Sequence, residues 1–89
     1  MAWSGMDVAA VERVAHELRR QSDRIDTVTR AVDSAVASSQ ECWTGEDASR
    51  FCSGWQEDRS MLAGLSGSLE LLAKKAAQQA ADQRRSSQL

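Results

Sequence analysis

One apolar repeat runs along most of this chain and is interrupted only once, near the middle. Between residues 7 and 41, apolar or small side chains recur at alternating spacings of three and four, the period of a helix face packed along a seam. A second repeat of the same kind starts at Ala48 and lasts about five heptads. The sequence contains no proline, the strongest helix breaker. The pattern predicts an all-α chain built from two long amphipathic helices.

The interruption, Cys42-Trp43-Thr44-Gly45, predicts a tight turn. A link this short normally joins antiparallel helices, so we expect a helix-turn-helix hairpin. Thr44 followed three residues later by Asp47 resembles a capping box, which predicts that the second helix begins there. We expect Gly45 to allow the tight backbone, and Trp43 to pack on the hairpin end or on a partner. The expected single domain, residues 1–89, has a helix at about 7–41, a turn at 42–45, a helix at about 46–82 and loose termini.

The two apolar stripes also predict an association surface. Each stripe is wider than one seam, because Val14, Val28, Met61 and Leu65 flank it. A lone hairpin would leave this apolar strip in water, and a second hairpin would cover it in a four-helix bundle. The residues predicted to form the dimer or hairpin interface are Val11, Leu18, Ile25, Val32, Phe51, Trp55, Leu62, Leu69 and Leu72.

Two glycines, Gly64 and Gly67, lie inside the second predicted helix. Each costs roughly 1 kcal/mol relative to alanine, which makes the helix locally soft. Alternatively, they form a small-residue strip with Ser60 that lets another helix approach closely.

The two cysteines, Cys42 and Cys52, are ten residues apart and lie on either side of the turn. A disulfide needs Cα atoms within about 7 Å. The intervening residues include almost two helical turns, which argues against a bond between the two cysteines. Cys52 lies on the same face as Phe51 and Trp55, and we expect it to be a small buried side chain.

Composition excludes several functional classes. Eleven basic and 13 acidic residues give a net charge of −2, without the basic footprint of a nucleic-acid-binding protein. The single histidine and the two cysteines lack the companions of a metal site, and no catalytic constellation or phosphate-binding loop is present. We therefore expect no enzymatic activity, no cofactor, no metal and no small-molecule substrate.

The segment from Trp43 to Phe51, Trp-Thr-Gly-Glu-Asp-Ala-Ser-Arg-Phe, resembles the signature of the WXG-motif family, the small Esx-type proteins of type VII secretion. The resemblance covers the whole chain, because Trp-x-Gly stands between two heptad repeats with Ala48 and Phe51 in phase. It implies a helical hairpin that pairs as a homodimer or with a second WXG-type protein. It further implies a chain from actinobacteria or related bacteria that is made in the cytoplasm and secreted without a Sec signal peptide, with the type VII ATPase as a possible partner.

One feature departs from this family. Its export signal is commonly Tyr-x-x-x-Asp/Glu in the tail of at least one partner, whereas this chain contains no tyrosine. The resemblance therefore implies either a type VII substrate with another signal or the carrier partner of a substrate. The alternative function is a structural coiled-coil adaptor subunit that is not exported.

Overall fold

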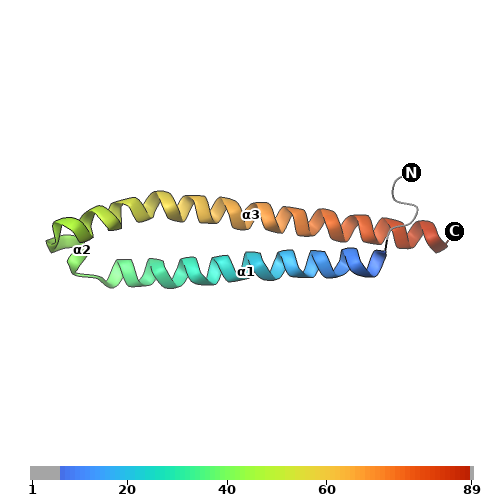
Figure 1. The fold of residues 1–89 in the computed structure, drawn as a ribbon, viewed down its shortest axis with the longest axis horizontal. Coiled ribbons are helices and arrows are strands. Elements are labelled where there is room, and N and C mark those ends of the chain that lie inside the picture. The colour runs from blue at the N-terminus through green and yellow to red at the C-terminus, as the bar shows by residue number, and fades with distance from the viewer. Residues whose placement is uncertain (1–6, 89) are drawn as a thin grey trace.

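Two long antiparallel helices make up most of the described chain (Figure 1). The computed structural model describes residues 7–88, which form three helices: α1 at Val8–Ser38, α2 at Glu41–Thr44 and α3 at Glu46–Gln88. The molecule measures 67 × 18 × 13 Å. The start of α1 and the end of α3 lie at the same end of this rod, with the turn at the other (Figure 1). The predicted helical hairpin is confirmed, and the described residues include no strand.

Helix α1 is defined by polar groups at both of its ends. The Asp7 carboxylate accepts a hydrogen bond of 3.0 Å from the backbone N–H of Ala10 and so caps the first turn. At the other end Ser39 adopts an extended backbone (φ −81°, ψ 116°), and its N–H donates to the Val36 carbonyl at 3.2 Å. The helix therefore stops at Ser38 rather than near residue 41, because the backbone of Ser39 leaves the helical region.

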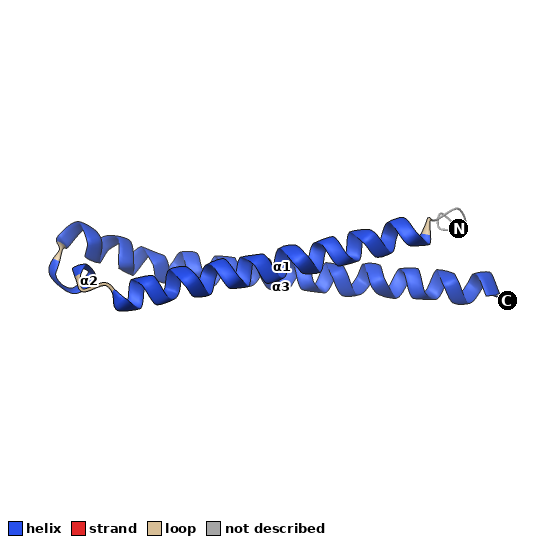
Figure 2. Ribbon diagram, turned by 90° about the horizontal axis from the view of Figure 1, so that it is seen from below, coloured by secondary structure: helices blue, strands red, loops and turns tan. Residues whose placement is uncertain are grey.

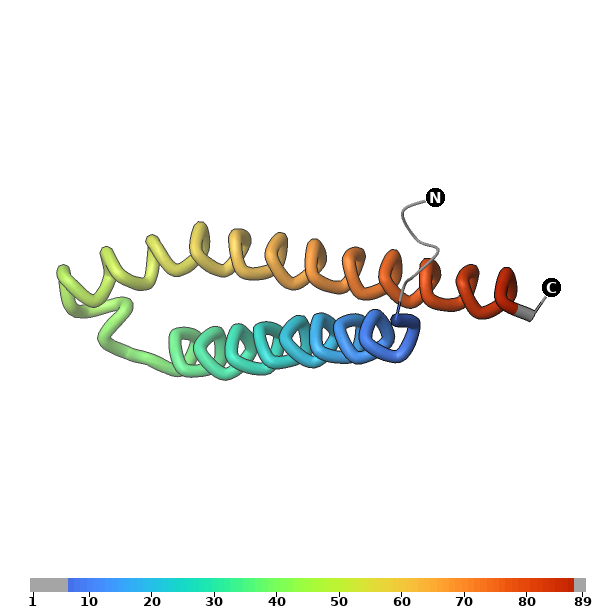
Figure 3. The backbone as a smooth tube through the Cα atoms, turned by 45° about the vertical axis from the view of Figure 1, so that its right-hand side comes forward, coloured from blue at the N-terminus to red at the C-terminus, as the bar shows by residue number. Residues whose placement is uncertain are grey.

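The turn contains a short helix that the sequence did not predict. Helix α2 occupies most of the predicted loop, and Figure 3 shows it doubling back between the two long helices. Thr44 does not cap α3: it ends α2, and its hydroxyl donates to the Gln40 carbonyl at 3.3 Å. Gly45 separates α2 from α3 with an extended backbone (φ −100°, ψ 130°). A Cβ atom at this position would lie 3.2 Å from the Glu41 carbonyl oxygen, so the close approach favours glycine.

Helix α3 extends through the C-terminal segment that was predicted to be loose. It continues to Gln88 instead of ending near residue 82. Ala80 is buried, and Arg84 pairs with Glu12 across the hairpin. These contacts give the last turns a partner that a fraying helix end lacks. The predicted looseness of residues 1–5 and of Leu89 lies outside the described residues.

The core between α1 and α3 is narrow and made mostly of small side chains. Its most buried members are Ala15, Ser22, Trp55, Ser66, Ala73 and Ala80. In Figure 2 the two helices cross near the middle of the rod, and Ser22 lies near the midpoint of α1. Serine and alanine allow the helix backbones to approach closely there. One continuous seam therefore holds the hairpin together.

Candidate interaction surface

Seven of the nine predicted interface residues lie along the seam of the hairpin. They are Val11, Leu18, Ile25, Val32, Trp55, Leu62 and Leu69, each buried or half-buried. Phe51 and Leu72 do not lie in the seam, since Phe51 is 62% exposed and Leu72 is 49% exposed. Their role at an interface with another chain stays a prediction.

The seam of α3 keeps the predicted Trp55, Leu62 and Leu69 and adds residues that were not predicted. After Leu62 it continues through Ser66, Leu69 and Ala73, all buried or half-buried. Leu72, which was predicted to lie at the interface, is exposed instead, and so is Leu65, which was predicted to flank the seam. Sequence reasoning missed Ser66 and Ala73 because a serine and an alanine give a weaker apolar signal than two leucines. The displaced leucines become available for contact with another molecule.

An open apolar surface, here called the apolar flank, runs along one side of the seam. In α1 its members are separated by multiples of seven residues, which places them on one helix face. In α3, Leu72 stands seven residues after Leu65, and Phe51 stands fourteen residues before it. Met61 stands one helical turn before Leu65. The apolar flank consists of Val14, Val28, Ala35, Phe51, Met61, Leu65 and Leu72, all exposed.

Two grooves lie beside the apolar flank, and the second of them joins its α1 and α3 parts. One groove is lined by Ile25 and Val28 of α1 together with Leu62 of α3. The other brings Ala35 of α1 next to Phe51 of α3. Large apolar side chains exposed beside apolar grooves are typical of a surface that binds another protein.

The opposite side of the seam, here called the polar flank, is closed by bonds between the helices. It consists of Glu12, Asp26, Asp33, Arg59 and Arg84. Glu12, Asp26 and Asp33 are separated by multiples of seven residues and share one face of α1. Arg84 pairs with Glu12, and Arg59 pairs with Asp33 at 3.3 Å. The charges of this flank are therefore engaged within the chain.

A buried serine pair joins the centre of the seam to the polar flank. The Ser22 hydroxyl donates either to the Ser66 carbonyl at 3.1 Å or to the Ser66 hydroxyl oxygen at 2.9 Å. The Ser66 hydroxyl in turn lies 2.7 Å from a carboxylate oxygen of Asp26, to which it can donate. A buried polar pair of this kind loses its partners when the helices slide, so it favours one register.

Trp55 provides a second polar link across the seam. Trp55 is only 6% exposed, and its indole N–H donates to the Asp33 carboxylate at 3.1 Å. The other oxygen of Asp33 receives Arg59. One aspartate thus holds two side chains of α3, and the large ring fills the seam near the turn.

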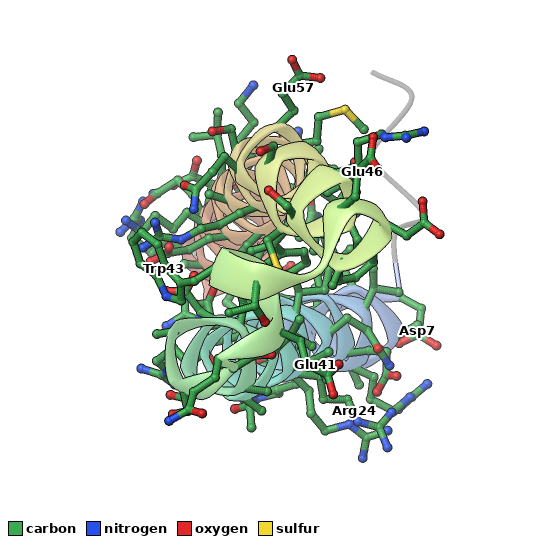
Figure 4. All side chains as sticks on the ribbon, turned by 90° about the vertical axis from the view of Figure 1, so that its left-hand side faces the viewer. Asp7, Arg24, Glu41, Trp43, Glu46 and Glu57 are labelled. Carbon is green, nitrogen blue, oxygen red and sulfur yellow. A yellow bond between two sulfur atoms is a disulfide. The ribbon has the colours of Figure 1, made fainter. Side chains whose placement is uncertain are left out.

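Trp43 lies at the turn and is directed away from the helical pair. It is 87% exposed, and Figure 4, viewed from the turn, shows it at the margin of the hairpin end. The prediction that Trp43 packs on the hairpin end is wrong. Because α1 stops at Ser38, the tryptophan sits on α2 and not above the seam. The predicted contact with a partner stays a prediction.

The two cysteines form a disulfide, contrary to the prediction. Cys42 lies in α2 and Cys52 in the second turn of α3, with their Cα atoms 5.9 Å apart. The sequence argument counted the helical turns between the two cysteines but did not include the short helix that folds the chain back. The early end of α1 and the fold-back of α2 bring the two residues within bonding range. Cys52 is half-buried as a bonded cysteine, and not as a free thiol.

Within residues 7–88, no other segment approaches either glycine in the middle of α3. A Cβ atom at Gly64 or Gly67 would meet nothing within 4 Å. The helix runs through both positions without a break. Within the hairpin, the small-residue strip therefore has no partner.

The outer face of α1 has the electrostatics of a solvated helix. The Gln21 amide donates a hydrogen bond of 2.7 Å to Glu17, and Arg20 lies 3.0 Å away. The hydrogen bond first, and then the charge of Arg20, hold the pKa of the Glu17 carboxyl below its ordinary value. Across residues 7–88 no three acidic, histidine or cysteine side chains gather as a metal site would require.

Neither a membrane span nor a relative gives a further indication of function. No helix among residues 7–88 combines the length and the apolar character needed to cross a membrane. Comparison of the chain with protein-family models, curated proteins and solved structures gave no match.

Proposed function

We propose that this chain is an Esx-type WXG protein that acts in type VII secretion through helix–helix dimerisation. The observation that carries the proposal is the position of Trp43-Thr44-Gly45 at the turn of a two-helix hairpin whose apolar flank is open. In this role the chain is a secretion substrate or the carrier partner of one. It would be made in the cytoplasm and leave the cell without a Sec signal peptide.

The apolar flank supports the dimeric part of the proposal. Its exposed aliphatic and aromatic side chains extend over both long helices, next to the grooves at Val28 and Phe51. Covering them with a second hairpin gives a four-helix bundle and removes apolar surface from water. The partner is a second copy of this chain or another WXG-type hairpin.

The turn supports a recognition role at one end of that bundle. Trp43 exposes a large ring, and aromatic side chains of this size are frequent anchors in protein interfaces. On this proposal Trp43 contacts a component of the secretion system, such as its ATPase. Since the chain has no tyrosine, the export signal with the family's usual Tyr-x-x-x-Asp/Glu form lies on the partner.

Dimerisation through the apolar flank is tested by Leu65→Glu, with Leu71→Glu as the matched control. The two leucines are 49% and 54% exposed, but they stand six residues apart and point about 120° away from each other. Leu65→Glu places a charge in the proposed interface, whereas Leu71→Glu does not. Light scattering should find a monomer for the first variant and a dimer for the second. A dimer for both variants would exclude this flank as the interface.

If the unmodified chain alone is monomeric, the same pair of variants is tested after co-expression with each WXG-type protein of the source organism. Capture of a partner by Leu71→Glu and not by Leu65→Glu supports a heterodimer. Failure of every hairpin to bind would contradict the dimeric mechanism.

Export is tested by comparing the culture medium of cells with and without an active type VII ATPase. The proposal predicts that the chain, with its partner, reaches the medium only when the ATPase works. Retention in the cells under both conditions would favour the structural coiled-coil adaptor. A cytoplasmic marker protein in the same medium controls for lysis.

A further inference from the structure

Gly45 connects the short helix α2 to α3 along the backbone, and among the described residues the Cys42–Cys52 disulfide is the one side-chain bond between these two helices. Four residues are too few for a helix to be stable in isolation. The backbone hydrogen bonds at its ends are local: the Trp43 N–H donates to the Gln40 carbonyl at 3.0 Å, and the Gly45 N–H donates to the Glu41 carbonyl at 2.8 Å. Cys42 is the one residue of α2 that is not exposed, and it is the residue bonded to Cys52.

The remaining contacts of α2 do not replace that bond. The ring of Trp43 is almost fully exposed, so it adds little packing to the turn. Glu41 and Thr44 are exposed as well. The grooves on either side of Cys42 and Cys52 are open surface, not a closed core. The order of the turn therefore depends on the disulfide far more than the order of the seam does.

We propose that the Cys42–Cys52 disulfide is a redox-controlled clasp for the turn that carries Trp43. In the oxidised chain the clasp fixes α2 against α3 and holds Trp43 in one position. In the reduced chain α2 is released from its fixed position against α3. Helices α1 and α3 stay paired, because the buried residues of the seam, such as Ala15 and Ala80, all lie outside the loop of residues 42–52 that the disulfide closes. The clasp requires only the two thiols of this chain and does not depend on the proposed export.

The chemistry is a thiol–disulfide exchange with a low-molecular-weight disulfide as oxidant. The thiolate of one cysteine attacks the oxidant, forms a mixed disulfide and releases one small thiol. The thiolate of the second cysteine then attacks the protein sulfur of the mixed disulfide and releases the second small thiol. Two protein thiols lose two electrons and two protons in total, and the oxidant gains both. A dithiol reductant reverses both steps.

The redox state of the compartment selects between the two forms. Cytosolic thiols are kept reduced, whereas disulfides persist in oxidising surroundings outside the cytosol. In the chain-entropy description, a disulfide that closes a loop of about ten residues disfavours the open conformations of that loop roughly a hundredfold. The turn is therefore expected to change from mobile to fixed when the chain enters an oxidising environment.

The clasp is tested by hydrogen–deuterium exchange of the full chain, read by mass spectrometry. One sample is oxidised with oxidised glutathione and the other is reduced with dithiothreitol, and alkylation counts zero and two free thiols respectively. The amides of Trp43, Gly45 and Ser49 report on the turn, because each donates a backbone hydrogen bond there. We expect these amides to exchange at least tenfold faster in the reduced chain. The amides of residues 62–80 should change less than twofold.

The double variant Cys42→Ser/Cys52→Ser provides the matched control. It should exchange rapidly at the turn and be insensitive to dithiothreitol. Equal exchange at the turn in oxidised and reduced chains would overturn the proposal. So would two free thiols after incubation with oxidised glutathione. Faster exchange along residues 62–80 as well would show that the bond stabilises the whole hairpin, which also contradicts a local clasp.

Discussion

The two flanks of the seam belong to the same pair of helices, but the side chains of one flank are bonded within the hairpin and those of the other are left exposed. On the polar flank, carboxylates of α1 receive bonds from α3: Asp26 from Ser66, and Asp33 from Trp55 and Arg59. On the apolar flank, residues such as Val28 and Leu65 remain exposed. The polar flank therefore stabilises the hairpin itself, and the apolar flank is available to bind another chain.

This difference separates two properties that a single wide apolar stripe would combine. A substitution in the polar flank should change the stability of the hairpin. A substitution in the apolar flank should change its association with another chain. The separation is useful for a protein that pairs with another hairpin, because the register of the pair of helices is set before the partner arrives.

The largest expected effect distinguishes two aromatic residues that stand one helical turn apart in α3. Trp55→Ala removes the buried ring and the bond to Asp33, and it should lower the free energy of unfolding by about 3–5 kcal/mol. Phe51→Ala removes an exposed ring and should cost under about 1 kcal/mol. Urea denaturation followed by circular dichroism measures both changes.

Both variants are best compared in a Leu65→Glu background, which is designed to keep the hairpin monomeric. Dissociation of a dimer would otherwise contribute to the measured free energy. If Phe51→Ala proved as costly as Trp55→Ala in that background, the apolar flank would be part of the hairpin core and the distinction between the flanks would fail.

An intermediate effect is expected from the serine pair at the centre of the seam. Ser66→Ala should cost about 1 kcal/mol, because it removes hydrogen bonds to Ser22 and Asp26. The double variant Ser22→Ala/Ser66→Ala should cost less than the sum of the single variants, since neither hydroxyl is then left without its partner. Ser68→Ala, at an exposed position of α3, is the control and should change stability by less than about 0.5 kcal/mol. Strict additivity would show that the two serines act separately.

The sequence predicted α1 more accurately than α3, and the reason is the kind of side chain that each contributes. The seam of α1 includes Val11, Leu18 and Val32, which stand out against charged neighbours, and its phase is as predicted. In α3 the seam uses Ser66 and Ala73, while Leu65 and Leu72 stand outside it. A count of apolar residues favours the leucines, because it does not include the close helix approach that small residues allow.

The turn was predicted in position but not in construction. The repeat located the interruption at residues 42–45, and the structure places the connection between the long helices there. What the sequence could not supply was the residue at which α1 ends. Helix α1 ends three residues earlier than predicted. This earlier end leaves room for α2, exposes Trp43 and brings Cys42 to Cys52. Helix ends depend on local hydrogen bonds, which periodicity does not record.

The smallest expected effect concerns the ion pair of Glu12 and Arg84 at the open end of the hairpin. Their side chains are 42% and 56% exposed, so water and salt weaken their attraction. Glu12→Gln should therefore reduce the free energy of unfolding by no more than about 0.5 kcal/mol, and the difference should vanish in concentrated salt. Chemical denaturation at low and high ionic strength measures this, with Glu57→Gln on the outer face of α3 as the control. A salt-independent loss above about 1 kcal/mol would mean that the bond between Glu12 and Arg84 is shielded from solvent and stabilises the hairpin as the buried bonds do.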